Sequence, residues 1–307
     1  MGARSPGRFR TRPLARGAAA IQIQHVFFTM AIKADLHCHS TVSDGVLDPA
    51  QLALRASANG VELWALTDHD ELAGIATARQ AATELGMPFI AGVEISVSWA
   101  GKTVHILGLD VDENNAALGA GLASIRGGRM ERARRMADKL SQLGISGSYE
   151  GALAYAGNPL LVSRTHFARF MVDKGYCKNM QAVFDKYLGD GGPATVPMQW
   201  ATLEQAVAWI LAAGGRAAIA HPGRYDYSPM QFDALFDRFK DLGGTGIEVV
   251  TGSHTADQYA EYARVARRYG FLASCGSDFH SPKEGKLDLG ELPPLPADLK
   301  PIWHDWI

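Results

Sequence analysis

Asp35-Leu36-His37-Cys38-His39, near the start of the chain, places two imidazoles two residues apart at the end of an apolar run. Ser277-Asp278-Phe279-His280, near the other end, repeats this spacing with a carboxylate and an imidazole. Because successive side chains on a β-strand point to opposite faces, both members of each pair point to the same side. Pairs of this kind at the ends of apolar strands predict a single metal cluster that the fold gathers from across the chain.

Between these two stretches, short apolar runs alternate with amphipathic segments. The runs expected to be strands cover residues 34–37, 62–67, 89–94, 103–109, 216–220, 246–250 and 271–275. Helix-start signals lie between them, at Asp48-Pro49, Thr202-x-x-Gln205, Ser228-Pro229 and Thr255. This alternation predicts a parallel sheet, open or closed into a barrel, with its ligand site at the carboxyl ends of the strands. Several candidate ligands lie at or just past such ends: His37, Asp68-His69, Glu94, His221 and Asp278, with His105 inside the fourth run.

A helical pattern interrupts the alternation between about residues 120 and 197. Met130, Ala133, Ala137, Leu140 and Leu143 have the spacing of a buried stripe. We expect a barrel formed by residues 33–120 and 197–292, a mainly helical insertion at 121–196 that caps the site, and a C-terminal tail at 293–307. Residues 1–32 are rich in Arg, Ala and Gly with little periodicity, and we interpret them as a leader, with a targeting segment as the alternative.

The composition is that of a globular protein, with 47% hydrophobic and 20% charged residues among 307. A formal charge of −2 does not indicate a polyanion partner. Cys38, Cys177 and Cys275 show no paired spacing, so we expect them to be reduced, as is typical of a cytoplasmic protein. No run reaches the roughly 18 apolar residues of a membrane helix. Nothing in the sequence indicates a membrane or an obligate protein partner.

Some of these residues have two interpretations. Taken alone, His105 in an apolar run would more often be a core histidine than a ligand. Glu94 ends an apolar run, where an unpaired charge is costly to bury and a metal ion would remove that cost. Asp68 and His69 face opposite ways on a strand, so either one enters the site. Asp68 is then either an outer partner of the ligands or a plain carboxylate at a strand end.

Three neighbours of the ligands have simpler expected roles. Cys38, between two inward residues, should point into the barrel wall and be inert. Asp35 faces the same way as His37 and could orient a ligating imidazole. Asp70, in the turn after His69, is expected to cap a helix.

Read in order, six motifs resemble those of the PHP (polymerase and histidinol phosphatase) superfamily of metal-dependent phosphoesterases, over roughly residues 33–290. They are Asp-Leu-His-Cys-His-Ser-Thr-x-Ser-Asp-Gly at 35–45, Leu-Thr-Asp-His-Asp at 66–70, Gly-Val-Glu at 92–94, His-Ile-Leu-Gly at 105–108, Ala-His-Pro-Gly at 220–223 and Gly-Ser-Asp-Phe-His at 276–280. The resemblance implies an α/β fold, a distorted barrel of seven strand-helix units. It also implies two or three metal ions, manganese first, with zinc, iron or magnesium as alternatives. The implied ligand sets are His37, His39, Glu94 and Asp278; Glu94, His105 and His221; and Asp44, His69 and His280.

Ser163-Arg164-Thr165-His166 is expected to begin a helix capped by Ser163. Free backbone N–H groups, an Arg at the first position and a His two residues later favour an anion site, with an ordinary surface helix as the alternative. On the preceding helix, most arginines should face solvent, and one or two could reach a second phosphate; they are Arg129, Arg132, Arg134 and Arg135. Of these four, Arg134 and Arg135 are assigned to substrate binding.

Two more residues are candidates on the rim of the barrel. Arg224, three residues past His221, is close enough to the metals to clamp a phosphoryl oxygen. His254, after the sixth strand, is a candidate phosphate donor or general acid. With Asp68 and His221, His254 completes the candidate catalytic residues.

The motif set is similar to that of the bacterial branch that hydrolyses nucleoside 3′,5′-bisphosphates to nucleoside 5′-monophosphates. Relatives of that branch trim short 5′-phosphorylated RNA from the 5′ end. The resemblance therefore implies a hydrolase in which water attacks phosphorus in line, with metals and arginines balancing the charge. The alternatives are a histidinol-phosphate-type monophosphatase of the same superfamily, a non-catalytic accessory module, and an amidohydrolase acting on C–N bonds.

Overall fold

The computed structural model describes residues 1–2, 32–285 and 287–306. Apart from residues 1, 2 and 32, the leader predicted at residues 1–32 lies outside this range. The compact unit that carries the site is Ala31–Ile307.

Seven strands form one sheet whose spatial order follows the sequence. The strands are β1 (Ala34–Asp35), β2 (Leu63–Leu66), β3 (Phe89–Trp99), β4 (Lys102–Leu109), β5 (Arg216–Ile219), β6 (Gly246–Thr251) and β7 (Leu272–Gly276). The first and last strands meet, because the Leu36 N–H donates to the Cys275 carbonyl at 3.0 Å and Cys38 pairs with Phe279. The expected α/β barrel of seven strands is confirmed, and it is nearly closed.

The prediction that all strands run parallel is wrong for β4. This strand runs antiparallel to both β3 and β5, whereas the other neighbours are parallel. Ala100 and Gly101 alone join β3 to β4, with φ of +46° and +78°, and two residues leave room only for a hairpin. Strand β3 therefore continues past Glu94 to Trp99, and His105 lies opposite Ser96 in mid-strand.

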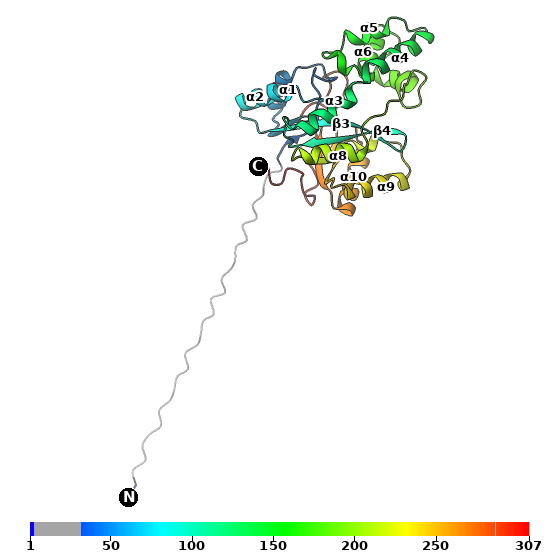
Figure 1. The fold of residues 1–307 in the computed structure, drawn as a ribbon. Helices are drawn as coiled ribbons and strands as arrows, with labels where there is room; N and C mark the ends of the chain where they lie inside the picture. The colour runs from blue at the N-terminus through cyan, green and yellow to red at the C-terminus, as the bar shows by residue number, and fades with distance from the viewer. Residues whose placement is uncertain (3–31, 286, 307) are drawn as a thin grey trace. The chain divides into compact units, whose positions relative to one another are not determined.

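The barrel helices are α1 (Pro49–Ala58), α2 (Ile75–Glu84), α3 (Ala116–Arg126), α8 (Leu203–Ala212), α9 (Pro229–Asp241) and α10 (Ala256–Tyr269). All four predicted start signals are confirmed as capping boxes, formed by Asp48 with Gln51, Thr202 with Gln205, Ser228 with Gln231 and Thr255 with Gln258. Helix α8 packs on β3, β4 and β5, and α10 packs on β6 and β7 (Figure 1). These helices and strands share one large apolar core.

A second apolar cluster lies in the helices between α3 and α8. These are α4 (Arg129–Gln142), α5 (Ser148–Leu153), α6 (Arg164–Asp173) and α7 (Met180–Val183), with the short turns η1 (Pro159–Leu161) and η2 (Phe184–Leu188). Figure 1 shows α4, α5 and α6 gathered together. Their separate core supports the proposed insertion at 121–196. The stripe predicted on α4 is partly wrong, since Met136 joins Ala133 and Leu140 inside, while Leu143 is 44% exposed.

The C-terminal segment packs against the barrel. Ala273 of β7 exchanges backbone hydrogen bonds with Lys300 and Ile302, each of 2.9 Å, and Ile302 and Trp303 are buried. Among the residues that the structure describes, no helix combines the length and the apolar character needed to cross a membrane.

Candidate metal centre

All the residues predicted as metal ligands converge at one end of the barrel. His37 and His39 follow β1, Asp44 lies in the next loop, His69 follows β2, Glu94 and His105 lie in β3 and β4, His221 follows β5, and Asp278 and His280 follow β7. The segments that meet here span more than 240 positions of the chain. The fold thus brings together side chains that the sequence keeps far apart.

Glu94 lies at the centre of this cluster. Its Oε1 is 2.8 Å from both His105 Nδ1 and His221 Nε2. Its Oε2 is 2.9 Å from His69 Nδ1 and 3.3 Å from the Nε2 atoms of His37 and His39. Burial favours the neutral acid, but the surrounding imidazoles outweigh it and hold the pKa of Glu94 well below its usual value. Glu94 is therefore a buried carboxylate shared by several imidazoles.

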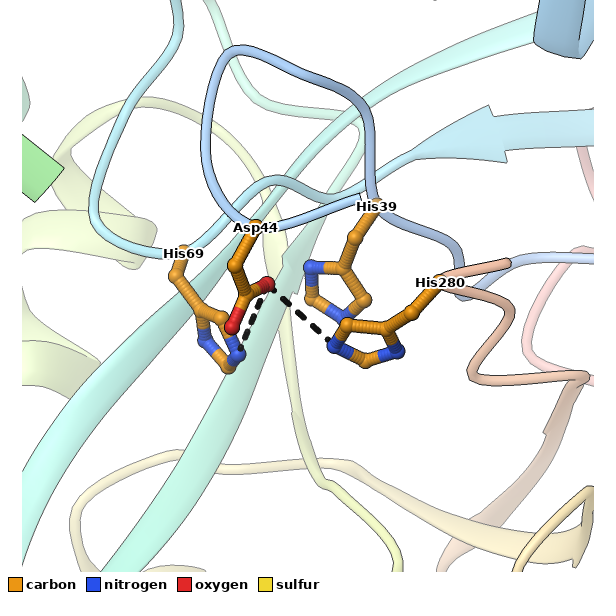
Figure 2. Close-up of side chains that lie close together, drawn as sticks. All are labelled: His39, Asp44, His69 and His280. Atoms are coloured by element: carbon orange, nitrogen blue, oxygen red, sulfur yellow. Dashed lines mark ion pairs between the residues drawn. The ribbon is translucent and has the colours of Figure 1, made fainter. Parts of the chain in front are cut away.

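Two further groups flank Glu94. Asp278 Oδ1 lies 3.5 Å from His37 Nε2 and 3.3 Å from His39 Nε2. Asp44 Oδ1 lies 3.2 Å from His280 Nε2 and 3.8 Å from His69 Nε2. Figure 2 shows His39, His69 and His280 arranged around the carboxylate of Asp44. Potential ligand atoms of these four residues all lie within 4.8 Å of one another.

The donor atoms fit metal ions. The Nε2 atoms of His37 and His39 face each other at 3.2 Å, and His105 Nδ1 faces His221 Nε2 at 3.3 Å. Within the described part of the chain, five buried atoms of the cluster have no well-aligned hydrogen bond: His39 Nδ1, Asp44 Oδ1, His69 Nδ1, Glu94 Oε2 and His221 Nδ1. Two of them, His69 Nδ1 and Glu94 Oε2, lie only 2.9 Å apart. Buried polar atoms without partners are costly, and a cation would bind these oxygens and the nitrogen lone pairs together. Imidazole with carboxylate is a donor set suited to manganese, iron and zinc.

The structure resolves the choice between Asp68 and His69. His69 points at Glu94. Asp68 turns the other way and accepts hydrogen bonds from Ser40 N–H at 2.8 Å, Ser40 Oγ at 2.6 Å and Ser43 Oγ at 2.5 Å. The prediction of Asp68 as a catalytic residue is therefore corrected, because its carboxylate holds the loop that carries Asp44.

The expected roles of two other acids are also wrong. Asp35 accepts the backbone N–H groups of Ser277 and Gly290, at 2.8 and 2.9 Å, so it orients no imidazole. Asp70 caps no helix, because the residue before α2 is Gly74. Its carboxylate instead accepts hydrogen bonds from Ser96 and pairs with the buried Arg129 of α4.

Sequence reasoning missed Glu248, in the middle of β6. Its side chain is fully buried and contacts His37 and the backbone of His221. The sequence did contain a signal for this residue. Glu248 is the one acid in the apolar run Gly-Ile-Glu-Val-Val, just as Glu94 is the one acid in the apolar run that it ends. An acid in such a position needs a partner.

The start of α6 lies at the edge of this cluster. Ser163 caps the helix as predicted, and its hydroxyl donates to Asp44 Oδ2 at 3.1 Å. Ser163 N–H donates to His166 Nδ1 at 3.0 Å, and burial lowers the pKa of His166 to about 4, so its Nε2 carries the proton. Arg164 pairs with Asp190 at 3.0 Å. Ser163, Arg164 and His166, the three residues predicted at this helix start, thus all lie at the N-terminus of α6.

The arginines of α4 are arranged differently from the prediction. Arg134 and Arg135 are exposed, and Arg134 lies over the Tyr149 ring of α5. Arg129 and Arg132 turn inward instead and lie against the Trp200 ring. The substrate-binding role of Arg134 and Arg135 stays a prediction.

Arg224 and His254, the two candidates on the rim, have different surroundings. Arg224 is half exposed and pairs with Asp278 Oδ2 at 3.0 Å, beside the cluster as predicted. His254 is buried; its Nε2 accepts the Gly223 N–H at 2.9 Å, and its Nδ1 lies 3.3 Å from the Val249 carbonyl. The prediction of His254 as a general acid or phosphate donor is corrected, since backbone groups occupy both ring nitrogens. His221 keeps a ligand position, because its Nε2 faces Glu94.

A nearly closed α/β barrel with imidazoles and carboxylates gathered at its mouth defines a metal-dependent hydrolase. The family model of the PHP domain matches residues 35–126. Over 271 residues the chain is 51% identical to the 3′,5′-nucleoside bisphosphate phosphatase of Chromobacterium violaceum, covering 88% of this chain and 95% of that protein. It is 43% identical over 275 residues to a 5′-3′ exoribonuclease of Haemophilus influenzae, covering 90% and 99%.

A solved structure from Chromobacterium violaceum, described as an amidohydrolase with bound sulfate and no metal, is similarly close. It matches with a TM-score of 0.86 and 51% identity over 89% of this chain and 95% of that chain. These similarities extend over nearly the whole length of each relative. The chain belongs to the PHP family.

Proposed function

We propose that this protein removes the 3′-phosphate of nucleoside 3′,5′-bisphosphates, leaving nucleoside 5′-monophosphates, with manganese as its metal. The proposed ligand sets are His37, His39, Glu94 and Asp278; Glu94, His105 and His221; and Asp44, His69 and His280. Bound metal ions would lower the pKa of water toward neutrality for attack on phosphorus and would stabilise the developing charge. The phosphatase from Chromobacterium violaceum is similar to nearly the whole chain, which supports this choice of reaction.

The observation that carries the proposal is the contact between Ser163 Oγ and Asp44 Oδ2, at 3.1 Å. It sets the start of a ten-residue helix directly beside the third ligand set. The N-terminus of such a helix, with Arg164 at its first position, is a favourable place for an anion. A substrate with one phosphate at the metals and another at α6 would use both sites. A substrate with a single phosphate would leave the anion site at α6 unoccupied.

The charge around α6 also favours a second phosphate. Burial, together with the nearby Arg164 and Arg129, lowers the pKa of Arg132 to about 9. Arg132 forms no ion pair within the described residues, and Asp190 is the partner of Arg164. A phosphate between these arginines would balance their charge, so we add Arg132 to the proposed anchor. Arg224, half exposed beside Asp278, is proposed to hold the phosphoryl group that reacts.

The test is phosphate release from adenosine 3′,5′-bisphosphate with added manganese, with the nucleotide product identified. Wild type is compared with Arg164→Ala and with Arg267→Ala, which removes a partly exposed arginine that lies in the last turn of α10 and pairs with Asp298. We expect adenosine 5′-monophosphate from wild type. Loss of a hydrogen-bonded charge contact predicts that kcat/KM falls about 10- to 100-fold in Arg164→Ala only.

Three results would contradict the proposal in different ways. Turnover of histidinol phosphate without turnover of the bisphosphate would identify a monophosphatase. Hydrolysis of an amide in place of any phosphoester would identify an amidohydrolase. Absence of turnover on every phosphoester by the metal-loaded protein, a generic aryl phosphate included, would identify a non-catalytic module.

Short 5′-phosphorylated RNA is the second candidate substrate, because the exoribonuclease from Haemophilus influenzae is also similar to nearly the whole chain. The same geometry would serve, with the 5′-phosphate at α6 and the adjoining phosphodiester at the metals. Digestion of a short RNA with a 5′-phosphate, compared with the same RNA carrying a 5′-hydroxyl, tests this. Equal rates on the two RNAs would rule out the anchor at α6.

We place the enzyme in the cytoplasm. Cys38, Cys177 and Cys275 are all free and buried. Free thiols of this kind are typical of a reducing compartment.

A further inference from the structure

Glu248 contacts two of the proposed ligands but belongs to none of the ligand sets. Its Oε1 lies 3.0 Å from His37 Nδ1. Its Oε2 accepts the backbone N–H of His221 at 2.6 Å. The carboxylate is fully buried in β6 and contacts residues that belong to two different sets.

The contact with His37 determines which ring nitrogen carries the proton. A carboxylate can only accept, so Nδ1 must donate, and in the neutral ring Nε2 then keeps its lone pair. Nε2 is the atom that points at the cluster, 3.3 Å from Glu94 and 3.5 Å from Asp278. A metal ligand needs that lone pair, so Glu248 keeps His37 in the tautomer that can bind a metal.

The contact with His221 supports an unfavourable backbone conformation. His221 has φ of +26° and ψ of 56°, a left-handed conformation that costs energy for any residue other than glycine. This conformation lets Nε2 approach Glu94 Oε1 at 2.8 Å. Without Glu248, the buried N–H of His221 would lose its acceptor, and the strained turn would lose a hydrogen bond that holds it.

We propose that Glu248 is a positioning residue of the metal centre, which selects the ligating tautomer of His37 and holds the backbone of His221. This inference rests on the proposed use of His37 and His221 as metal ligands, and it is independent of the substrate. Partners of this kind typically contribute about 10- to 100-fold to metal affinity.

Glu248→Gln tests the proposal because it preserves the size of the side chain and one acceptor. The amide oxygen can accept from His221 N–H, and the NH₂ group then faces His37 Nδ1 and requires an acceptor there. His37 must move its proton to Nε2, which removes the ligating lone pair. We expect manganese affinity, measured by electron paramagnetic resonance of free Mn²⁺, to fall about 10- to 100-fold. The ¹⁵N chemical shifts of His37 in the metal-free protein, recorded at a pH high enough for the ring to be neutral, should show the proton moving from Nδ1 to Nε2.

Two further variants separate this role from ordinary structural damage. Glu248→Asp keeps an ionised acceptor and should retain the Nδ1–H tautomer. Asp35→Asn changes a carboxylate that is equally buried and accepts two backbone N–H groups, but touches no ligand side chain. It should lower Tm and leave manganese affinity unchanged.

Two outcomes would overturn the proposal. One is an unchanged His37 tautomer in Glu248→Gln, and the other is an equal loss of manganese affinity in Glu248→Gln and Asp35→Asn. A wild-type protein that binds no manganese and no other divalent metal would refute the ligand sets themselves, and this inference with them. Failure on adenosine 3′,5′-bisphosphate alone would refute only the proposed substrate.

Discussion

Asp68, Glu94 and Glu248 are buried carboxylates at or within apolar strands, and each has a different set of partners. Glu94 faces imidazoles on both of its oxygens. Asp68 accepts hydrogen bonds from the loop that carries Asp44. Glu248 accepts from one imidazole and one backbone N–H. The cost of burying a carboxylate predicts that each must have a partner, and only the neighbours in space determine its role.

His254 provides a prediction at the residue scale, for the metal-free protein. Burial lowers the pKa of His254 from 6.5 to about 4. As pH falls from about 6.5 to about 4, His254 binds a proton in the unfolded chain but not in the folded chain. The free energy of unfolding therefore falls with pH over this range and levels off below about pH 4. His254→Gln keeps an acceptor for the Gly223 N–H and removes the titration. Wild type should lose up to about 3 kcal/mol more than the variant between about pH 7 and about pH 4.

Urea unfolding of both proteins at several pH values, with a chelator present, measures this difference. Parallel stability curves would show that His254 titrates alike in the folded and unfolded chains. The comparison uses the difference between two variants, so the other titrating groups of the protein cancel to first order.

At the scale of elements, helix starts serve two purposes in this protein. The capping boxes of α1, α8, α9 and α10 are local devices that begin barrel helices. The cap of α6 is also a contact, because Ser163 donates to Asp44 while its backbone N–H donates to His166. A second contact joins this helix to the segment that follows His280. It is a bidentate ion pair between Arg169 of α6 and Glu284, with both hydrogen bonds at 2.7 Å.

The dual role of Ser163 gives a prediction at this scale. Ser163→Ala and Ser228→Ala each remove a serine cap from a capping box, so each should lower the free energy of unfolding by about 1 kcal/mol. Ser228 begins α9 and is exposed, and its box contacts only Gln231. Only Ser163→Ala should therefore raise KM for the bisphosphate, by about 3- to 10-fold, because only this cap adjoins the proposed second anion site. Steady-state kinetics and chemical unfolding of both variants test this, and equal KM values would remove α6 from the site.

At the scale of the whole molecule, the proposed metal centre joins the two ends of the barrel sequence. His37 and His39 lie in the segment after the first strand, and Asp278 and His280 lie in the segment after the last. A cluster drawn from both ends can assemble only when the barrel closes. Metal binding and global stability are therefore expected to be coupled.

This coupling predicts a metal-dependent melting temperature. A ligand present at about 100 times its Kd stabilises the folded state by about 2.7 kcal/mol. For a chain of this size we expect added manganese to raise Tm by roughly 5 °C or more, and a chelator to reverse the change. Differential scanning calorimetry of wild type and Glu94→Gln measures the effect, and the variant should respond little because Glu94 is shared by two of the ligand sets. An equal rise in both proteins would place the responsible metal outside this cluster.

The sequence by itself determined the seven strands, the helix caps and the set of imidazoles and carboxylates that meet at one end of the barrel. These follow from local periodicity and from polar residues at the ends of apolar runs. Both signals can be read within the residues of a single strand or turn. All the proposed ligands except Asp44 could be named in advance from their places at strand ends or within strands, and Asp44, which lies in a loop, was implied only by the resemblance of the motifs.

The tertiary structure decided the rest. In the tertiary structure β4 runs antiparallel to its neighbours, and His69 rather than Asp68 enters the cluster. Arg134 is exposed, both ring nitrogens of His254 contact backbone groups, and Glu248 contacts His37. Each of these depends on a partner contributed by a distant segment or by a neighbouring strand, and no local pattern records which partner that will be. Burial requires that a polar group be satisfied, and the closed barrel determines which residue satisfies it.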